Sequence, residues 1–262
     1  MLNSTGSMKT VATCSAAVLL ALAVYESAAG DSNKSAANVN ENSFLSLLVP
    51  KTIFVTSDQY SGDLVTEAAA LGFLGSNGLA AADFICQYHA GAAGLSGTYV
   101  AVLSSSMVNA NARLTASLGP YRLTNGTPVS ENFAALFSAT FGSEFSTPPT
   151  PAISLISGID HDEYGWDVDS PAPDHTRLVW TGSTPLGEVP LFHWSGQSNR
   201  STCSDWTEDS YDGADQPQEE CDASLNVEYC GLVGLSSSKG ARWTDYWYAR
   251  CDSTQHLYCA QK

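Results

Sequence analysis

Basic residues are scarce in this chain of 262 residues: 11 Lys and Arg oppose 27 Asp and Glu, for a formal net charge of −16. Charged residues of both signs make up only 15% of the chain. Binding to DNA or RNA depends on clustered Lys and Arg, and an acidic surface repels the phosphate backbone. The composition therefore argues against nucleic acid as a partner.

Short motifs of the common catalytic sites are also absent. The sequence contains no GxSxG, no HExxH and no Gly-rich phosphate loop, and its five histidines are scattered. Carboxylates are so numerous that no single pair stands out as the two acids of a glycosidase. We expect a protein that is not an enzyme, with a secreted hydrolase using an acidic pair as the alternative.

Only one long apolar run occurs, near the N-terminus, and it is too short to span a bilayer. Lys9 precedes the run VATCSAAVLLALAV, and Ser27 and Ala29 then occupy the −3 and −1 positions of a signal-peptidase site. We predict that residues 1–29 are a secretion signal, with a buried N-terminal helix as the alternative. The mature protein is expected outside the cell, secreted or at the cell surface, or in the periplasm, with no membrane span.

The remaining chain divides into a linker and one domain. Residues 30–50 are polar and rich in Ser and Asn, which predicts a flexible linker. Residues 51–262 form the expected domain, because 44% of the chain is hydrophobic and 10% aromatic, enough for a sizeable core.

Within this domain the patterns predict an α+β fold. Segments rich in β-branched and aromatic residues predict strands at 51–57, 97–106 and 176–183. The segment 78–95 has helical spacing of its apolar residues and places Cys86 near the buried face. Short strands are expected from residue 190 onward, where large apolar area comes from four tryptophans: Trp194, Trp206, Trp243 and Trp247.

After removal of the signal, six cysteines remain: Cys86, Cys203, Cys221, Cys230, Cys251 and Cys259. An even number in a secreted chain favours disulfides, although six cysteines allow 15 pairings. A structural zinc site is the alternative, but there is no CxxC pair, and His256 is the only histidine near the cysteines.

The acidic stretch DGADQPQEEC, residues 212–221, is the first candidate ligand loop. Its Gln216-Pro217 pair is similar to the Pro-containing tripeptides with which C-type lectins bind sugar through calcium, but no Trp-Asn-Asp stands elsewhere in the chain to complete such a site. A solvated loop tied by a disulfide is the alternative. The candidate ligand-contact residues are Trp206, Asp212, Asp215, Gln216 and Glu219.

A second acidic patch surrounds the sequence Asp160-His161-Asp162-Glu163. Its spacing is not that of an EF-hand, but Asp160, Asp162 and Asp174 are candidate ligands of a structural ion, with calcium as the candidate cofactor. A plain solvated loop is the alternative, because runs of charge are most often solvated.

Several features follow one another in a characteristic order: IFVTS, the helix with Cys86, GLSGTYVAVLS, GPYRLTNGTPV, VWTGS, CSDW, GLVG and a final LYC. This order resembles the bacterial domain-of-unknown-function family related to endostatin, whose better-known members are leptospiral endostatin-like surface proteins. The resemblance covers residues 52–260. It implies an endostatin-like, C-type-lectin-like α+β domain with a twisted antiparallel sheet, two short helices and long disulfide-tied loops.

The resemblance also implies a disulfide pattern and a role. It pairs Cys86 with Cys259 and Cys203 with Cys251, which leaves Cys221 for Cys230. We expect a non-enzymatic binding domain that recognises an extracellular protein or a carbohydrate through loops at about residues 145–175 and 205–230, because such folds place recognition on loops. A structural protein of the cell envelope is a further alternative.

Overall fold

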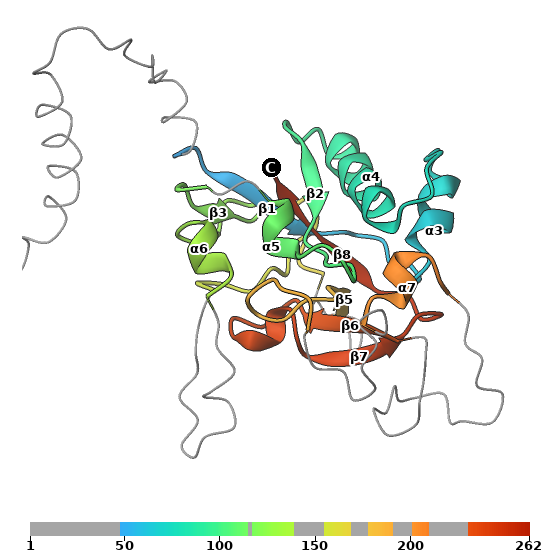
Figure 1. Cartoon of the computed structure of the whole chain (residues 1–262). Coiled ribbons are helices and arrows are strands. Elements are labelled where there is room, and N and C mark those ends of the chain that lie inside the picture. The colour runs from blue at the N-terminus through green and yellow to red at the C-terminus, as the bar shows by residue number, and fades with distance from the viewer. Residues whose placement is uncertain (1–47, 115–116, 139–154, 169–177, 191–200, 210–229) are drawn as a thin grey trace, which may run out of the picture. The chain divides into compact units, whose positions relative to one another are not determined.

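The computed structural model describes residues 48–114, 117–138, 155–168, 178–190, 201–209 and 230–262 (Figure 1). All of them belong to the compact unit Phe44–Lys262. The expected signal at 1–29, nearly all of the expected linker and the acidic stretch at 212–221 lie outside the described residues.

A mixed sheet forms the centre of this unit (Figure 1). Its eight strands in the described part of the chain are β1 (Lys51–Val55), β2 (Tyr99–Ala101), β3 (Tyr121–Arg122), β4 (Pro128–Ser130), β5 (Leu178–Trp180), β6 (Cys230–Leu235), β7 (Trp247–Arg250) and β8 (His256–Gln261). They run in the order β4-β3-β1-β8-β5-β6-β7, with β2 paired to β8 beside this path. The pairs β1–β3 and β5–β8 are parallel, so the expectation of an antiparallel sheet is wrong in these two places.

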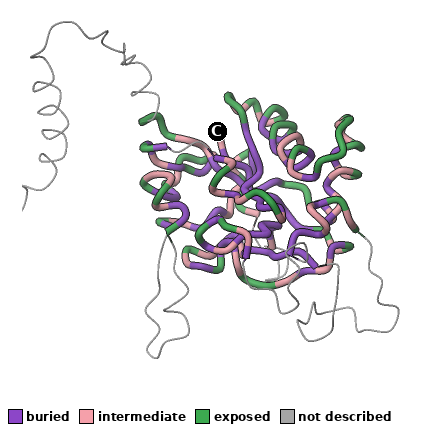
Figure 2. Tube along the Cα trace, viewed as in Figure 1, coloured by how far each residue is buried: buried purple, intermediate pink, exposed green. Residues whose placement is uncertain are grey.

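The last strand of the chain is the centre of the sheet. β8 pairs antiparallel with both β1 and β2, and it aligns Phe54 with Cys259 and Val55 with Tyr258. Five of its six residues are buried, in keeping with an apolar run that has structure on both faces (Figure 2). The first and last strands of the domain therefore support each other directly.

Two regular helices pack beside the sheet: α3 (Leu64–Ala70) and α4 (Gly78–Ala92). The side chain of Asn77 accepts a hydrogen bond from the Ala80 amide and so caps the start of α4. Ile85, Cys86 and His89 form part of the buried face of α4, as its apolar spacing predicts. The predicted helix at 78–95 and strand at 51–57 are thus confirmed, apart from their ends.

The structure adds short helices that the two-helix expectation did not include. Three have four residues each, α5 (Ala110–Arg113), α6 (Phe133–Leu136) and α7 (Cys203–Trp206), and η3 (Ala241–Trp243) is a 3₁₀ turn. No helix in the described ranges has both the length and the apolar character needed to cross a membrane.

Two disulfides close the unit, and both are pairs that the resemblance implied. Cys86–Cys259 joins the middle of α4 to β8, and Cys203–Cys251 joins α7 to the residue after β7. The chain-entropy model gives about 5 kcal/mol of stabilisation for the first closure and about 4 kcal/mol for the second. Cys230 is disulfide-bonded as well, and its expected partner Cys221 lies outside the described residues.

Tryptophans supply much of the interior, but not the four that the sequence indicated. Trp206 and Trp243 are fully buried as expected, and they are joined in the core by Trp180. Trp247 is instead 52% exposed on β7, and Trp194 lies outside the described residues. The indole Nε1 of Trp180 donates to the carbonyl of Tyr60, which satisfies the polar atom of this buried ring.

Candidate functional site

The segment Asp160–Val168 folds into a small hairpin within the loop region that we expected to contact a ligand. His161 and Asp167 form an antiparallel bridge, and the amide of Asp162 donates to the carbonyl of Trp166 at 2.9 Å. The amide of Gly165 donates to the carbonyl of Asp162 at 3.1 Å, and Gly165 has φ of +86°. A three-residue loop that ends in a left-handed glycine is a favoured way to close a hairpin, so this turn requires Gly165.

The carboxylate of Asp162 stabilises the turn from inside. Its Oδ1 accepts hydrogen bonds from the amides of Tyr164 and Trp166, at 2.9 and 2.8 Å. Its carbonyl accepts a bond from the hydroxyl of Thr124, at 2.7 Å, which ties the hairpin to the turn between β3 and β4. Asp162 is therefore a buried turn residue, whereas the sequence suggested a metal ligand.

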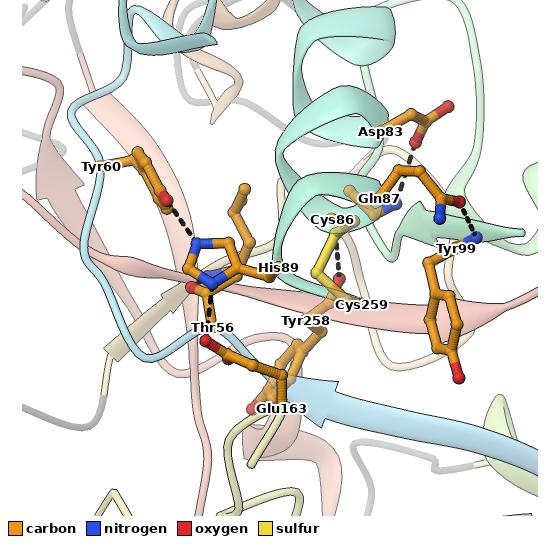
Figure 3. The surroundings of a disulfide bond; sticks show 12 residues. Thr56, Tyr60, Asp83, Cys86, Gln87, His89, Tyr99, Glu163, Tyr258 and Cys259 are labelled. Atoms are coloured by element: carbon orange, nitrogen blue, oxygen red, sulfur yellow. Dashed lines mark hydrogen bonds and ion pairs between the residues drawn. A yellow bond between two sulfur atoms is a disulfide. The ribbon is translucent and has the colours of Figure 1, made fainter. Parts of the chain in front are cut away.

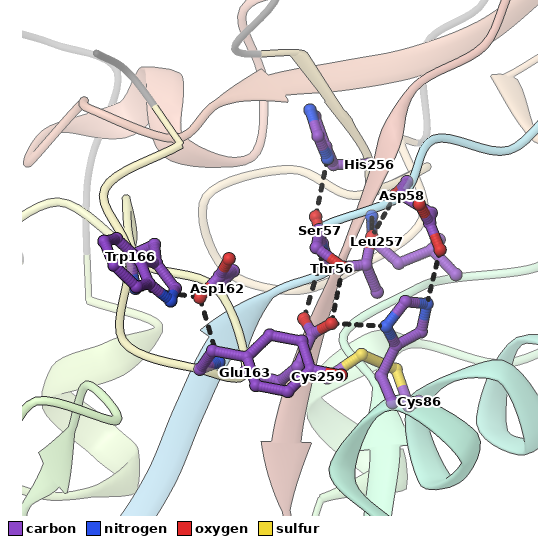
Figure 4. Close-up of polar contacts among 12 residues, drawn as sticks. Thr56, Ser57, Asp58, Cys86, Asp162, Glu163, Trp166, His256, Leu257 and Cys259 are labelled. Carbon is purple, nitrogen blue, oxygen red and sulfur yellow. Dashed lines mark hydrogen bonds and ion pairs between the residues drawn. A yellow bond between two sulfur atoms is a disulfide. The ribbon is translucent and has the colours of Figure 1, made fainter. Parts of the chain in front are cut away.

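Glu163, at the tip of the hairpin, points into the protein (Figure 4). Its Oε1 lies 2.7 Å from Nδ1 of His89 and accepts a bond from the Ser57 hydroxyl at 2.5 Å. Its Oε2 accepts a bond from the Ser57 amide at 3.0 Å. The side chains of His89 and Glu163 are only 3% and 1% exposed. The hairpin is thus anchored to α4 and to the segment after β1 by one buried carboxylate.

The second nitrogen of His89 contacts a buried phenol (Figure 3). Nδ1 carries the proton that it donates to Glu163, because a carboxylate only accepts, and Nε2 lies 2.5 Å from the Tyr60 hydroxyl. Burial raises the pKa of Tyr60, and the nearby carboxylates of Asp58 and Glu163 raise it further. Tyr60 therefore remains protonated at neutral pH.

Two opposing effects set the pKa of Glu163. Burial acts to raise it, but hydrogen bonds from His89 and Ser57 and the charge of His89 outweigh burial and lower the pKa below its usual value. Glu163 is therefore ionised at neutral pH, and its two oxygens are acceptors for the groups that hold it.

A second buried histidine fixes the segment that carries Ser57 and Tyr60. Gln59 Nε2 donates to Nε2 of His256 at 3.1 Å, so Nδ1 of His256 carries the proton and donates to the carbonyl of Thr56 at 2.6 Å. The hydroxyl of Thr56 accepts a bond from the amide of Leu257 on β8. The central strand thereby determines where Ser57 meets the hairpin.

The same hairpin directs two large aromatic side chains to solvent. Tyr164 is 56% exposed and Trp166 is 73% exposed, on either side of Gly165. Trp and Tyr are the side chains that most often anchor binding interfaces, so these two exposed rings are candidate ligand contacts. The residues of the hairpin therefore fall into two groups: Asp162 and Glu163 hold the turn, and the side chains of Tyr164 and Trp166 face outward.

The candidate metal ligands do not converge in the described residues. Asp160 Oδ1 lies 2.7 Å from Nδ1 of the neighbouring His161, and Asp162 is occupied by its own turn. No group of three or more His, Cys, Asp or Glu in the described ranges is placed to hold a metal ion. Asp174 lies outside those ranges, so calcium binding stays a prediction.

The candidate ligand residues of the second loop have two outcomes. Asp212, Asp215, Gln216 and Glu219 lie outside the described residues. Trp206 is a core residue and not a surface contact, so its expected ligand role is wrong. It is fully buried, packs against Trp180 at 5.7 Å between ring centroids, and donates its indole Nε1 to the Ser104 carbonyl.

Sequence reasoning missed the anchoring pair and the outward-facing aromatics. Glu163 and His89 are 74 residues apart, and no local pattern connects them. The signal that was available is the sequence Asp162-Glu163-Tyr164-Gly165-Trp166, which combines a turn-forming Asp and Gly with two aromatic residues.

Comparison with models of known protein families finds no match to this chain, and a search of curated proteins finds no significant relative.

Replacing Glu163 tests the anchor. We expect Glu163→Gln to lower the free energy of unfolding by about 3 kcal/mol, because it removes one partner of a buried charged contact with His89. Asp58→Asn is the matched control: Asp58 lies 4.0 Å from the same histidine but is 75% exposed, so its loss should cost less than about 0.5 kcal/mol. Urea unfolding at neutral pH measures both values, and equal effects of the two variants would contradict the anchoring role.

The stability of the protein should also depend on acid through Glu163. The pKa of Glu163 is lower in the folded protein than in the unfolded chain, so its contribution is complete above the usual pKa and is lost as the pH falls through the folded value. Between about pH 5 and pH 3, wild type should therefore lose more stability than Glu163→Gln. Parallel curves for the two proteins would show that Glu163 does not titrate in this way.

Proposed function

We propose that this protein is a secreted, non-enzymatic binding domain that recognises an extracellular protein or a carbohydrate through Tyr164 and Trp166. The observation that carries the proposal is the exposure of both rings on a hairpin whose backbone is fixed by Asp162 and Glu163. The two disulfides are compatible with a protein outside the cell, because such bonds persist in oxidising compartments.

The hairpin is pre-organised for binding. A ligand that stacks on Trp166 does not need to order the loop first, because the Trp166 amide and carbonyl are already bonded to Asp162. Less entropy is then lost on association, and more of the contact energy remains as affinity. Aromatic side chains add large contact area with few rotatable bonds, and they suit both protein surfaces and the apolar faces of sugars.

We further propose that the fold is endostatin-like and belongs to the C-type-lectin-like class. The order of the sequence elements supports this, together with a bridge from the long helix to the last strand and the pairing of β1 with β8. In such folds ligand contact falls on loops held by a rigid sheet, which is the arrangement of the hairpin Asp160–Val168.

A binding screen tests the proposal. The purified secreted protein is applied to arrays of glycans and of extracellular-matrix and serum proteins, with calcium and with chelator, and the affinity of each hit is then titrated. We expect Trp166→Ala and Tyr164→Ala each to weaken the selected interaction at least about tenfold, as for aromatic anchors of other interfaces.

Trp247→Ala is the matched control, because Trp247 is a half-exposed tryptophan on β7, away from the hairpin in sequence. It should leave the affinity within about twofold of wild type. Wild-type affinity in both hairpin variants would contradict the proposal, as would turnover of a polysaccharide on the array. Loss of a sugar interaction in chelator would place calcium in the site.

A further inference from the structure

One short segment of the core has an unusual backbone. Cys203, Ser204, Asp205 and Trp206 have φ values of +45°, +52°, +61° and +68°. The amide of Trp206 donates to the carbonyl of Thr202, and that of Thr207 to Cys203, so α7 is a turn of left-handed helix. None of the four residues is glycine, and L-residues disfavour this conformation, above all in consecutive positions. The turn persists only because its surroundings impose it.

Contacts at both ends and in the middle hold the left-handed turn. The disulfide to Cys251 fixes its first residue, and the burial of Trp206 against Trp180 fixes its last. Between them, the carboxylate of Asp205 accepts bonds from the amide and the hydroxyl of Ser106, both at 2.6 Å. The disulfide is the only covalent member of this set, so its cleavage frees one end of a strained segment.

Glycines line this disulfide at positions where a larger residue would not fit. A Cβ atom on Gly62 would lie 2.6 Å from Sγ of Cys203 and 2.8 Å from Cβ of Cys251, and one on Gly231 would lie 3.0 Å from the Cys203 sulfur. A Cβ on Gly78, the first residue of α4, would lie 2.1 Å from the carbonyl oxygen of Asp205. The turn is therefore packed tightly against the start of α4, so a movement of α7 would displace the first residues of α4.

The other described disulfide has no such strain. Cys86 lies in the middle of the regular helix α4, and Cys259 lies in β8 between its partner strands. Neither residue has a positive φ. Reduction of Cys86–Cys259 would therefore relieve no left-handed backbone, whereas reduction of Cys203–Cys251 would allow α7 to relax.

We propose that Cys203–Cys251 is a redox-sensitive latch, opened by a dithiol reductant under conditions that leave Cys86–Cys259 intact. A thiolate of the reductant attacks one sulfur, the bond between Cys203 and Cys251 breaks, and a mixed disulfide forms. The second thiol of the reductant then resolves it, which leaves two cysteine thiols and the oxidised, cyclic reductant. Relief of the backbone strain in α7 favours this reduction, because strained disulfides are the more easily reduced ones.

The latch acts on one end of α4 only. Opening it releases Asp205 from Ser106 and the turn from Gly78, while Cys86 continues to hold the later part of α4 to β8. His89 lies one turn beyond Cys86, so the anchor of Glu163 is retained. The proposed binding hairpin is therefore expected to keep its anchor when the latch opens.

Equilibration in buffers of reduced and oxidised dithiothreitol tests the latch. The full protein is quenched with acid, alkylated and mapped by mass spectrometry under conditions in which it stays folded. We expect half-reduction of Cys203–Cys251 at a ratio of reduced to oxidised reagent at least tenfold lower than for Cys86–Cys259. Reduction of both bridges at the same ratio, or of Cys86–Cys259 first, would overturn the proposal.

Two variants of Ser204 separate strain from other causes. Ser204→Gly removes the steric cost of a positive φ while keeping the contacts of Asp205 and Trp206, so the bridge should need at least threefold more reduced reagent for half-reduction. Ser204→Ala removes the hydroxyl but keeps Cβ, and its midpoint should stay within twofold of wild type. Equal midpoints for the glycine and alanine variants would show that backbone strain does not drive the reduction.

Discussion

A buried contact between Glu163 of the hairpin and His89 of α4 determines where the outward-facing aromatic rings stand. Both elements that hold this carboxylate are fixed to the sheet: α4 is bonded to β8 through Cys86–Cys259, and Ser57 lies two residues after β1, which pairs with β8. The carboxylate of Glu163 accepts bonds from both elements. The hairpin is thereby held in place by elements that are attached to the central strand, although it has few backbone hydrogen bonds of its own.

The two described disulfides make different contributions to the same unit. Cys86–Cys259 joins regular elements at the centre of the structure and supports the hairpin anchor. Cys203–Cys251 instead retains a left-handed turn that its own residues disfavour. A domain built this way can respond locally to a reductant at one end of α4 and keep its surface loop unchanged at the other.

Local patterns in the sequence predicted the elements that local physics determines. The apolar spacing around Ile85 and the β-branched run at Ile53 gave α4 and β1 correctly, because periodic burial is visible in the residues themselves. The directions of the strands were partly wrong, because β1 meets β3 and β5 meets β8 only in the folded chain. The resemblance, and not any local pattern, supplied the two disulfide pairs.

The site was harder to predict, because its contacts also form only in the folded chain. Charge density suggested metal binding at Asp162, but the nearest groups to a carboxylate in a tight turn are the amides of that turn. Composition also could not tell which tryptophans enter the core: Trp206 is buried and Trp166 exposed, although both stand in acidic, loop-like sequence. Burial here follows from long-range packing, which a single sequence does not display.

The hairpin is already folded without a ligand in this structure, and amide hydrogen exchange of the free protein measures this property. The amides of Asp162, Gly165 and Trp166 donate within the hairpin, and we predict that they exchange at least about 100-fold more slowly than in an unstructured peptide. Exchange of these three amides at the unstructured rate, while β8 remains protected, would show that the hairpin is not folded in the free protein.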